Sequence, residues 1–212
     1  MLVVVAIIGI LIALLLPALQ AAREAGAAVS LVSGPVSLEA PDGAARTMVE
    51  SAQQMLEAVL AEVAAGCDLF IAAAAVADYR PVRPATRKIK KQADCTTLEL
   101  QPAPDILATV AALKNRPFCV GFAAETEQLQ RHAQKKRLGK GVEMIAANRV
   151  GKDLGFETDQ NELLLVWEGG SELLAMDVKT RLARRLIERI ADLYRNRTKY
   201  RGLSHDHAEN SA

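Results

Sequence analysis

Residues 69–80 have the features of a strand that ends at a binding site. The segment 69–74 is apolar and ends in small alanine side chains, and Asp78 follows shortly after it. Small side chains let a ligand approach the backbone closely, and a carboxylate can hold a hydroxyl group or a metal ion. In open α/β sheets, ligands bind at the carboxyl ends of the strands. The pattern therefore predicts a ligand site around Asp78.

A positive stretch at residues 80–91 follows Asp78 and includes Lys88. We interpret it as a flap that closes over the phosphates of a nucleotide, with each lysine acting as a point charge. A solvated loop without function is the alternative. Binding of nucleic acid is disfavoured, because no aromatic residue is interleaved with these charges and the net charge of the chain is only +1.

Two later segments offer further contacts for an anion. Pro104 precedes a predicted helix at 105–114, and the free N–H groups at a helix start attract anions. Lys136 and Lys140 lie late in a predicted helix at 126–140, on one face, so both can reach one triphosphate. The structural alternatives are an ordinary proline-first helix start and a basic last turn that balances the helix dipole.

The elements that must position these residues alternate along the chain. Strands are predicted at 29–32, 69–74, 118–122 and 144–147, and helices at about 47–65, 105–114, 126–140 and 178–194. This order predicts a parallel sheet with helices on both faces. Strands at 163–167 and 173–176 flank a Gly-Gly turn and predict a hairpin. The fold class is α/β: a Rossmann-like, doubly wound, mainly parallel sheet with an antiparallel edge hairpin and a long flap at 79–104.

Composition narrows the function classes. A length of 212 residues suffices for one domain with a core. The cysteines Cys67, Cys95 and Cys119 are too widely spaced for a disulfide framework or a zinc site, so a reducing compartment such as the cytoplasm is expected. An aromatic content of 4% argues against base-stacking platforms for single-stranded nucleic acid.

The first 22 residues carry no charged side chain and have two interpretations. One is a strand followed by a buried helix of a soluble sheet. The other is an apolar helix over residues 1–25, which is similar to the N-terminal helix of type IV pilin-like proteins. In that case residues 1–19 would contact a membrane and the protein would be membrane-associated. The main domain is then expected at 26–197, and the polar residues 198–212 are predicted to be a disordered tail.

Residues 26–194 resemble the phosphopantothenate–cysteine ligase family, the synthetase half of the bifunctional coenzyme A biosynthesis flavoprotein. The similar segments are GAAVSLVSGPVSL, AAAAVADYRP, RKIKKQ, PAPDIL, VGFAAET, AQKKRLGKG, ANRVG and GFETDQN. In that family the carboxylate of 4′-phosphopantothenate attacks the α-phosphate of CTP in the presence of Mg²⁺ and releases pyrophosphate. The amine of cysteine then attacks the acyl-cytidylate.

The resemblance also implies partners and site residues. It implies a homodimer in which the flap reaches the partner, and no flavin, because the decarboxylase half is absent. Lys88 would be catalytic and would stabilise the charge that develops on the acyl phosphate. No side chain is expected to ligate a metal directly. The implied nucleotide-binding residues are Ala72, Ala73, Ala74, Asp78, Lys88, Pro104, Asp105, Ile106, Leu107, Phe122, Lys136 and Lys140.

The chain departs from the family in its opening segment. The family begins with a strand, a Gly-Pro-Thr loop and an Asn-x-Ser-Ser-Gly-x-x-Gly segment that helps to hold phosphate groups. This sequence has the apolar stretch in that place. The resemblance therefore implies impaired turnover, and the alternative is a non-catalytic nucleotide-binding remnant that is tethered to a membrane.

Overall fold

A central sheet organises the chain in the computed structural model, which describes residues 3–8, 12–36, 40, 42–85, 87–90, 95–150 and 160–209. The sheet has eight strands in the order β10-β9-β8-β7-β4-β1-β2-β3. The strands are β1 (Val3–Ile8), β2 (Ala28–Ser33), β3 (Ala45–Met48), β4 (Leu69–Ala73), β7 (Phe118–Glu125), β8 (Met144–Arg149), β9 (Gln160–Trp167) and β10 (Gly170–Val178).

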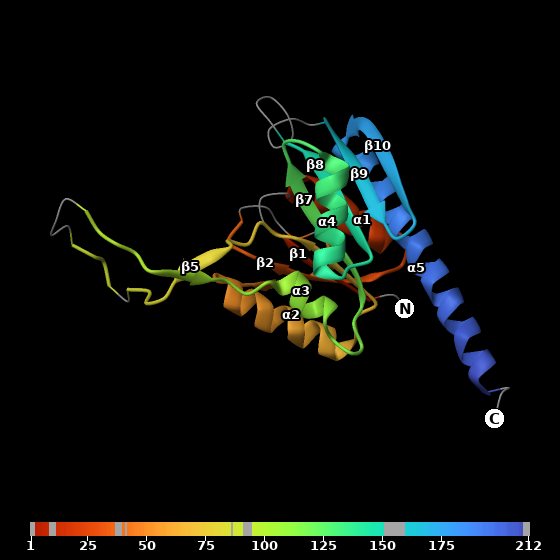
Figure 1. The fold of residues 1–212 in the computed structure, drawn as a ribbon, viewed down its shortest axis with the longest axis horizontal. Helices are drawn as coiled ribbons and strands as arrows, with labels where there is room; N and C mark the ends of the chain where they lie inside the picture. The colour runs from red at the N-terminus through yellow and green to blue at the C-terminus, as the bar shows by residue number, and fades with distance from the viewer. Residues whose placement is uncertain are drawn as a thin grey trace.

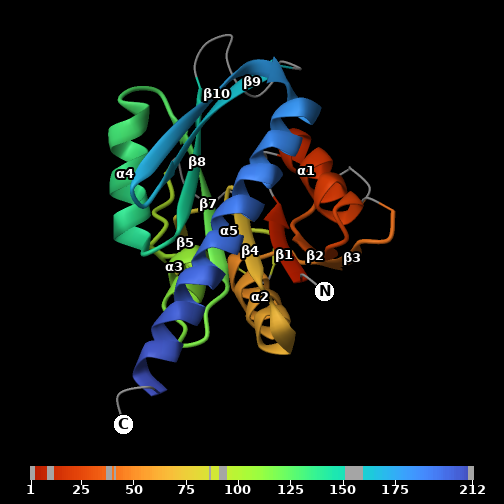
Figure 2. The same cartoon turned by 90° about the vertical axis from the view of Figure 1, so that its right-hand side faces the viewer.

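Helices cover both faces of this sheet. Figure 1 shows α2, α3 and α4 on one face, and Figure 2 shows α1 and α5 next to each other on the opposite face. The helices are α1 (Ile12–Glu24), α2 (Ala52–Gly66), α3 (Ile106–Ala111), α4 (Leu129–Lys140) and α5 (Lys179–Glu209).

Strand connections confirm the predicted doubly wound fold. The strands from β3 to β8 in the sheet order pair in parallel, whereas β9 pairs antiparallel with both β8 and β10. From β1 the chain winds outward to β3, returns beside β1 with β4, and then winds the other way. The direction of winding reverses between β1 and β4, which is where open α/β sheets form their ligand crevice.

The sheet is buried on both faces, which explains the continuous apolar runs in its strands. Phe70 and Ile71 are neighbours in β4 and are both fully buried. Phe70 belongs to the core under α2, α3 and α4, and Ile71 belongs to the core under α1 and α5. The alternation of side chains along a strand thus decides which residues of β4 can face a ligand.

The predicted helix at 47–65 begins later in the structure, at Ala52. Residues 45–48 instead pair with β2 as the edge strand β3. Ser51 caps the helix: its hydroxyl accepts a hydrogen bond from the Gln54 backbone N–H, and the Gln54 side chain accepts one from the Ser51 N–H. This capping box fixes the helix start.

The N-terminal segment does not form the single helix that was expected over residues 1–25. Residues 3–8 form β1, which pairs with β2 and β4 in the middle of the sheet, and α1 follows. A run of β-branched residues favours a strand here, and its two neighbours satisfy its backbone groups. The interpretation as a strand plus a buried helix is therefore correct. Across the described residues, we find no helix with the length and apolarity needed to span a bilayer.

The tail expected to be disordered from residue 198 is also different. Helix α5 continues to Glu209, and no proline interrupts it. Tyr194 anchors its middle, because the Tyr194 hydroxyl donates to Oδ1 of Asp68 over 3.1 Å and the ring packs edge-on against Phe118. Residues 210–212 lie outside the described part of the chain.

The predicted flap has the form of a two-stranded arm. It begins with β5 (Tyr79–Pro81) and returns with β6 (Leu100–Pro102), which pair antiparallel. Figure 1 shows that the arm extends away from the sheet. Its large apolar side chains Tyr79, Leu98 and Leu100 are exposed, so the arm has apolar surface that its own chain does not cover.

Candidate functional site

A cavity of about 400 Å³ lies at the carboxyl ends of β4 and β7, between the base of the arm and helices α3 and α4. Its size falls in the range of small-molecule sites. It is lined by Ala72, Ala74, Val76, Ala77, Asp78, Pro102, Ala103, Pro104, Asp105, Ile106, Leu107, Phe122, Lys136 and Lys140.

Small residues form the floor of this cavity. Ala72 pairs with Gly121 of β7, and a Cβ atom on Gly121 would come within 2.5 Å of a Leu107 methyl group and 2.8 Å of an Ile145 methyl group. Glycine at this position therefore lets Leu107 pack directly against the strand. The first turn of α3 is held close to the sheet as a result.

The base of the arm forms one wall. The Ala103 backbone N–H donates to the Asp78 carbonyl oxygen over 2.8 Å, which ties the two ends of the arm together beside the cavity. The Asp78 side chain is exposed, so its carboxylate is accessible to a ligand. The sequence predicted a ligand site around Asp78, and the structure places this residue in the lining of the cavity.

A charged pair forms the opposite wall. The Asp105 carboxylate caps α3 by accepting the Ala108 N–H over 3.0 Å, and it also forms an ion pair with Lys140. Partial burial alone would raise the pKa of Asp105, but the hydrogen bond from Lys140 and the charges of Lys140 and Lys136 outweigh it, so the pKa is lowered. An anionic ligand would compete with Asp105 for Lys140.

Two predicted site residues are not part of this cavity. Ala73 is buried and faces the core under α1 and α5, because it alternates with Ala72 and Ala74 along the chain. Lys88 is exposed on the arm, outside the group of residues that line the cavity. The other ten predicted nucleotide-binding residues do come together in it.

Sequence reasoning missed four lining residues: Val76, Ala77, Pro102 and Ala103. Each lies within two positions of a predicted residue and has a small or apolar side chain, which is the signal that the sequence offered. What the sequence did not reveal is that the two ends of the arm meet at this wall.

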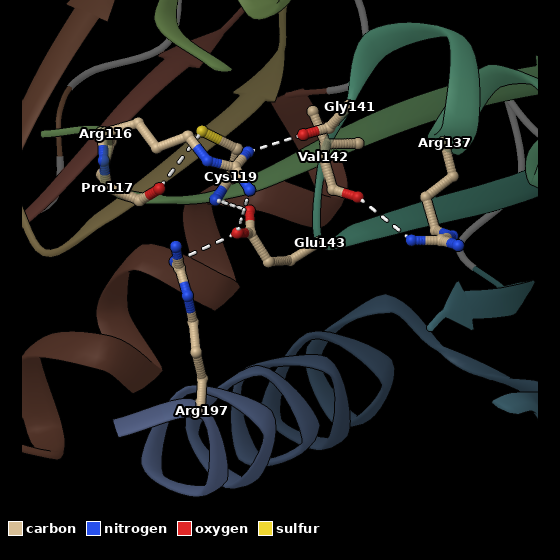
Figure 3. Close-up of polar contacts among 8 residues, drawn as sticks. All are labelled: Arg116, Pro117, Cys119, Arg137, Gly141, Val142, Glu143 and Arg197. Carbon is tan, nitrogen blue, oxygen red and sulfur yellow. Dashed lines mark hydrogen bonds and ion pairs between the residues drawn. The ribbon is translucent and has the colours of Figure 1, made fainter. Parts of the chain in front are cut away.

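A hub around Glu143 fixes the turn that follows α4 (Figure 3). The Glu143 carboxylate pairs with Arg116 at 2.8 Å and with Arg197 of α5 at 3.1 Å, and it accepts the Cys119 backbone N–H at 2.8 Å. Arg116 also donates to the carbonyl oxygen of Gly141, directly after Lys140. The hub therefore anchors the end of the helix that carries the cavity lysines.

The Cys119 thiol inside this hub is inert. Burial, reinforced by the negative charge of Glu143, raises its pKa to about 12. A thiol with such a pKa is protonated at neutral pH and is a poor nucleophile.

A second, more open groove of about 1230 Å³ lies between α4 and the β9–β10 hairpin. Its lining includes Arg131, Arg149 and Trp167 but none of the predicted site residues. We therefore place the candidate site in the smaller cavity. In the described part of the chain, no three His, Cys, Asp or Glu side chains gather closely enough to hold a metal ion.

Comparison with known proteins identifies the family. Residues 16–194 match the DNA/pantothenate metabolism flavoprotein C-terminal domain. The chain belongs to this family. The match begins within α1, ten residues before the segment in which the sequence resemblance was seen, so α1 is part of the family domain.

Relatives of this flavoprotein C-terminal domain are close in sequence. The chain is 46% identical over 178 residues to the coenzyme A biosynthesis bifunctional protein CoaBC of Vibrio parahaemolyticus, covering 82% of this chain and 44% of the relative. It is 45% identical over 179 residues to the protein of the same name from Escherichia coli K12, with the same coverage of both chains. The chain thus spans less than half the length of these curated relatives.

Solved structures agree with the fold. The crystal structure of the C-terminal domain of CoaBC matches with a TM-score of 0.75 and 29% identity, over 92% of this chain and 96% of that one. The DNA/pantothenate metabolism flavoprotein from Streptococcus pneumoniae matches with a TM-score of 0.74 at 18% identity, which supports the fold alone. The resemblance to the synthetase half of the coenzyme A protein is confirmed.

Proposed function

We propose that this chain acts in coenzyme A biosynthesis as a CTP-dependent phosphopantothenate–cysteine ligase. The observation that carries the proposal is the cavity, which gathers all of the implied nucleotide-binding residues except Ala73 and Lys88. Family membership supports the same reaction class.

The cavity has the groups that transfer of a nucleotidyl group from CTP to a carboxylate needs. Its alanine floor admits a flat group close to the backbone, and Asp78 offers a hydrogen-bond acceptor for hydroxyl groups. Lys136 and Lys140 bind the phosphates, and their charge stabilises the negative charge that moves onto pyrophosphate as it leaves. Positioning and charge compensation supply most of the catalysis in such reactions.

Lys88 fits the proposal through a second copy of the chain. It lies on the extended arm, whose exposed apolar residues need a covering surface. In the proposed homodimer the arm packs on the partner and Lys88 reaches the partner's cavity. There it stabilises the charge on the α-phosphate while the carboxylate of 4′-phosphopantothenate attacks.

Mg²⁺ fits the site as a companion of CTP. The carboxylates that line the cavity are Asp78 and Asp105, and Asp105 is paired with Lys140. Mg²⁺ is commonly held by one or two carboxylates together with substrate phosphates. Asp78 is therefore the residue that we expect to contact the hydrated ion through water, and the ion would neutralise phosphate charge. We expect no flavin, and we propose a cytoplasmic location.

A second candidate function is nucleotide binding without turnover. It is favoured by the apolar sequence of residues 9–16, which stands where the family has its Gly- and Ser-rich segment. Under this alternative CTP binds to the cavity but no pyrophosphate is released.

Pyrophosphate release with CTP, 4′-phosphopantothenate and cysteine separates the two functions. The ligase predicts release that requires CTP and 4′-phosphopantothenate and falls to background in a Lys88→Ala variant. Binding of CTP by calorimetry with no release above background would support the non-catalytic function. Absence of CTP binding would exclude both.

A further inference from the structure

Two buried amides at the rim of the sheet have unsatisfied polar atoms. Asn148 is 0% exposed and Asn161 is 3% exposed. Within the described residues, neither polar atom of the Asn148 side chain has a hydrogen-bond partner, and Nδ2 of Asn161 has none. Oδ1 of Asn161 accepts the Glu162 N–H over 2.9 Å. Unpaired buried amides are unfavourable and rare in native proteins, so this pair calls for a physical explanation.

Strand register places both amides on one face of the sheet. Ala147 of β8 pairs with Leu164 of β9, and continuing this antiparallel register sets Asn148 opposite Leu163. Asn161 is two residues from Leu163, so it shares its face. Leu163 belongs to the core under α1 and α5. The two amides are therefore diagonal neighbours, whose backbones lie about 7–8 Å apart. Both side chains could contact one ligand across this distance.

The same corner adjoins the cavity. Phe122 lines the cavity and pairs with Ala146, and two residues further along these strands Ala124 pairs with Asn148. Ala124 is exposed, so solvent reaches the strand next to Asn148, whose own side chain is buried. A ligand that leaves the cavity across Phe122 and Ala124 passes next to Asn148.

The size of the cavity suits one of the two substrates of the proposed reaction. About 400 Å³ is near the lower end of ligand sites and suits one nucleotide. The acid that reacts with the α-phosphate must then lie outside the cavity, along the rim. The unpaired side-chain amides of Asn148 and Asn161 are the buried polar groups nearest to this part of the rim.

We propose that Asn148, supported by Asn161, binds the acid substrate through its amide or hydroxyl groups. A carboxamide donates and accepts at the same time, which matches a secondary amide or a hydroxyl group. 4′-Phosphopantothenate carries both. The proposal rests on the proposed function and assigns residues to the second substrate, for which the cavity itself has no groups.

The test uses Asn148→Leu, which keeps the side-chain volume and removes the unpaired polar atoms. Because the amide has no partner in the free protein, the variant should melt at the same temperature as the wild type or higher. Its affinity for 4′-phosphopantothenate, measured by calorimetry alone and with CMP present, should fall about tenfold. Its affinity for CTP should not change.

Asn115→Leu is the matched control, because Asn115 is exposed on the loop before β7, at the opposite end of the strands. It should leave both affinities unchanged. A lower melting temperature of Asn148→Leu with unchanged 4′-phosphopantothenate affinity would overturn the proposal and indicate that a trapped water satisfies the amide. If wild type and variant bind the acid equally, the proposed function survives and this inference fails. If the wild type binds neither CTP nor the acid, both fail.

Discussion

At the scale of single residues, the cavity combines closely packed apolar side chains with two positive charges. Ala72 and Gly121 hold Leu107 close to the sheet, and Lys136 and Lys140 approach from α4. Most of these residues could be predicted from the sequence, because they follow strands or share a helical face. Ala73 could not be separated from Ala72 and Ala74 without knowing which face of β4 is covered by α1 and α5.

Lys136→Ala should weaken CTP binding about tenfold and leave the melting temperature almost unchanged, because a phosphate contact is lost while no described ion pair of Lys136 is broken. Calorimetry with CTP checks it. Lys135→Ala, which removes the adjacent exposed lysine that lies outside the cavity lining, is the control and should bind CTP normally. Equal affinities of the two variants would remove Lys136 from the site.

Asp105→Asn should show how much the Lys140 pair stabilises the fold. The pKa of Asp105 is lowered from 3.8, so its contribution is present above that value and is lost as the pH falls through the folded pKa. At neutral pH the variant should be less stable by about 0.5 kcal/mol, because the pair is partly exposed and asparagine still caps α3. Denaturant titrations should show this difference closing below about pH 4. A difference that persists at pH 2 would contradict this origin.

At the scale of elements, the turns between helices and strands decide where the charges lie. The end of α4 is held by Arg116, which joins Glu143 to the carbonyl of Gly141. The sequence predicted α4 and β8 but not this hub, because its members are far apart in the chain and only the folded sheet brings them together. The helix starts at Ala52, later than predicted, for a local reason: the capping box at Ser51 fixes its first turn.

Arg116→Ala and Arg197→Ala should therefore differ. Both remove a partner of Glu143 and should cost about 1–3 kcal/mol of unfolding free energy. Only Arg116→Ala frees the turn after Lys140, so only this variant should also lose affinity for CTP, and the loss should exceed that for CMP, which lacks the outer phosphates. Chemical denaturation and calorimetry measure the two effects. Equal losses of CTP affinity would mean that the hub acts only on overall stability.

At the scale of the whole molecule, the position of Lys88 relative to a site depends on the surface against which the arm packs. The sequence predicted an excursion at 79–104 but could not show that it projects as a two-stranded arm, since isolated pairs of strands take their position from what they pack against.

The N-terminal stretch shows the opposite case: an apolar run is equally suited to a membrane and to the centre of a sheet, and only its pairing with β2 and β4 decides between them.

Mixing two impaired variants, assayed at a CTP concentration too low for Lys136→Ala chains to bind it, should test whether the arm acts across a dimer. Lys88→Ala should lower turnover more than CTP affinity, since its role is in the transition state. When Lys88→Ala and Lys136→Ala chains are unfolded and refolded together, mixed dimers contain one site with both lysines intact. Activity should then recover to roughly a quarter of the wild-type value, as expected for random two-fold pairing. No recovery, with dimers present by light scattering, would place Lys88 in its own chain's site.

The attachment of α5 has a consequence for how the protein is made. The hydrogen bond from Tyr194 to Asp68 spans 126 positions in the sequence, and α5 packs on α1, which lies far earlier in the sequence. The part of this face that α5 covers consequently stays open until α5 has been synthesised. Contacts of such long range slow the final folding step, and the exposed apolar face of a partly synthesised chain is prone to aggregate. Because α5 is synthesised last among these elements, apolar side chains of the sheet stay exposed during synthesis. Chaperones that bind such surfaces are expected to assist the folding of this domain.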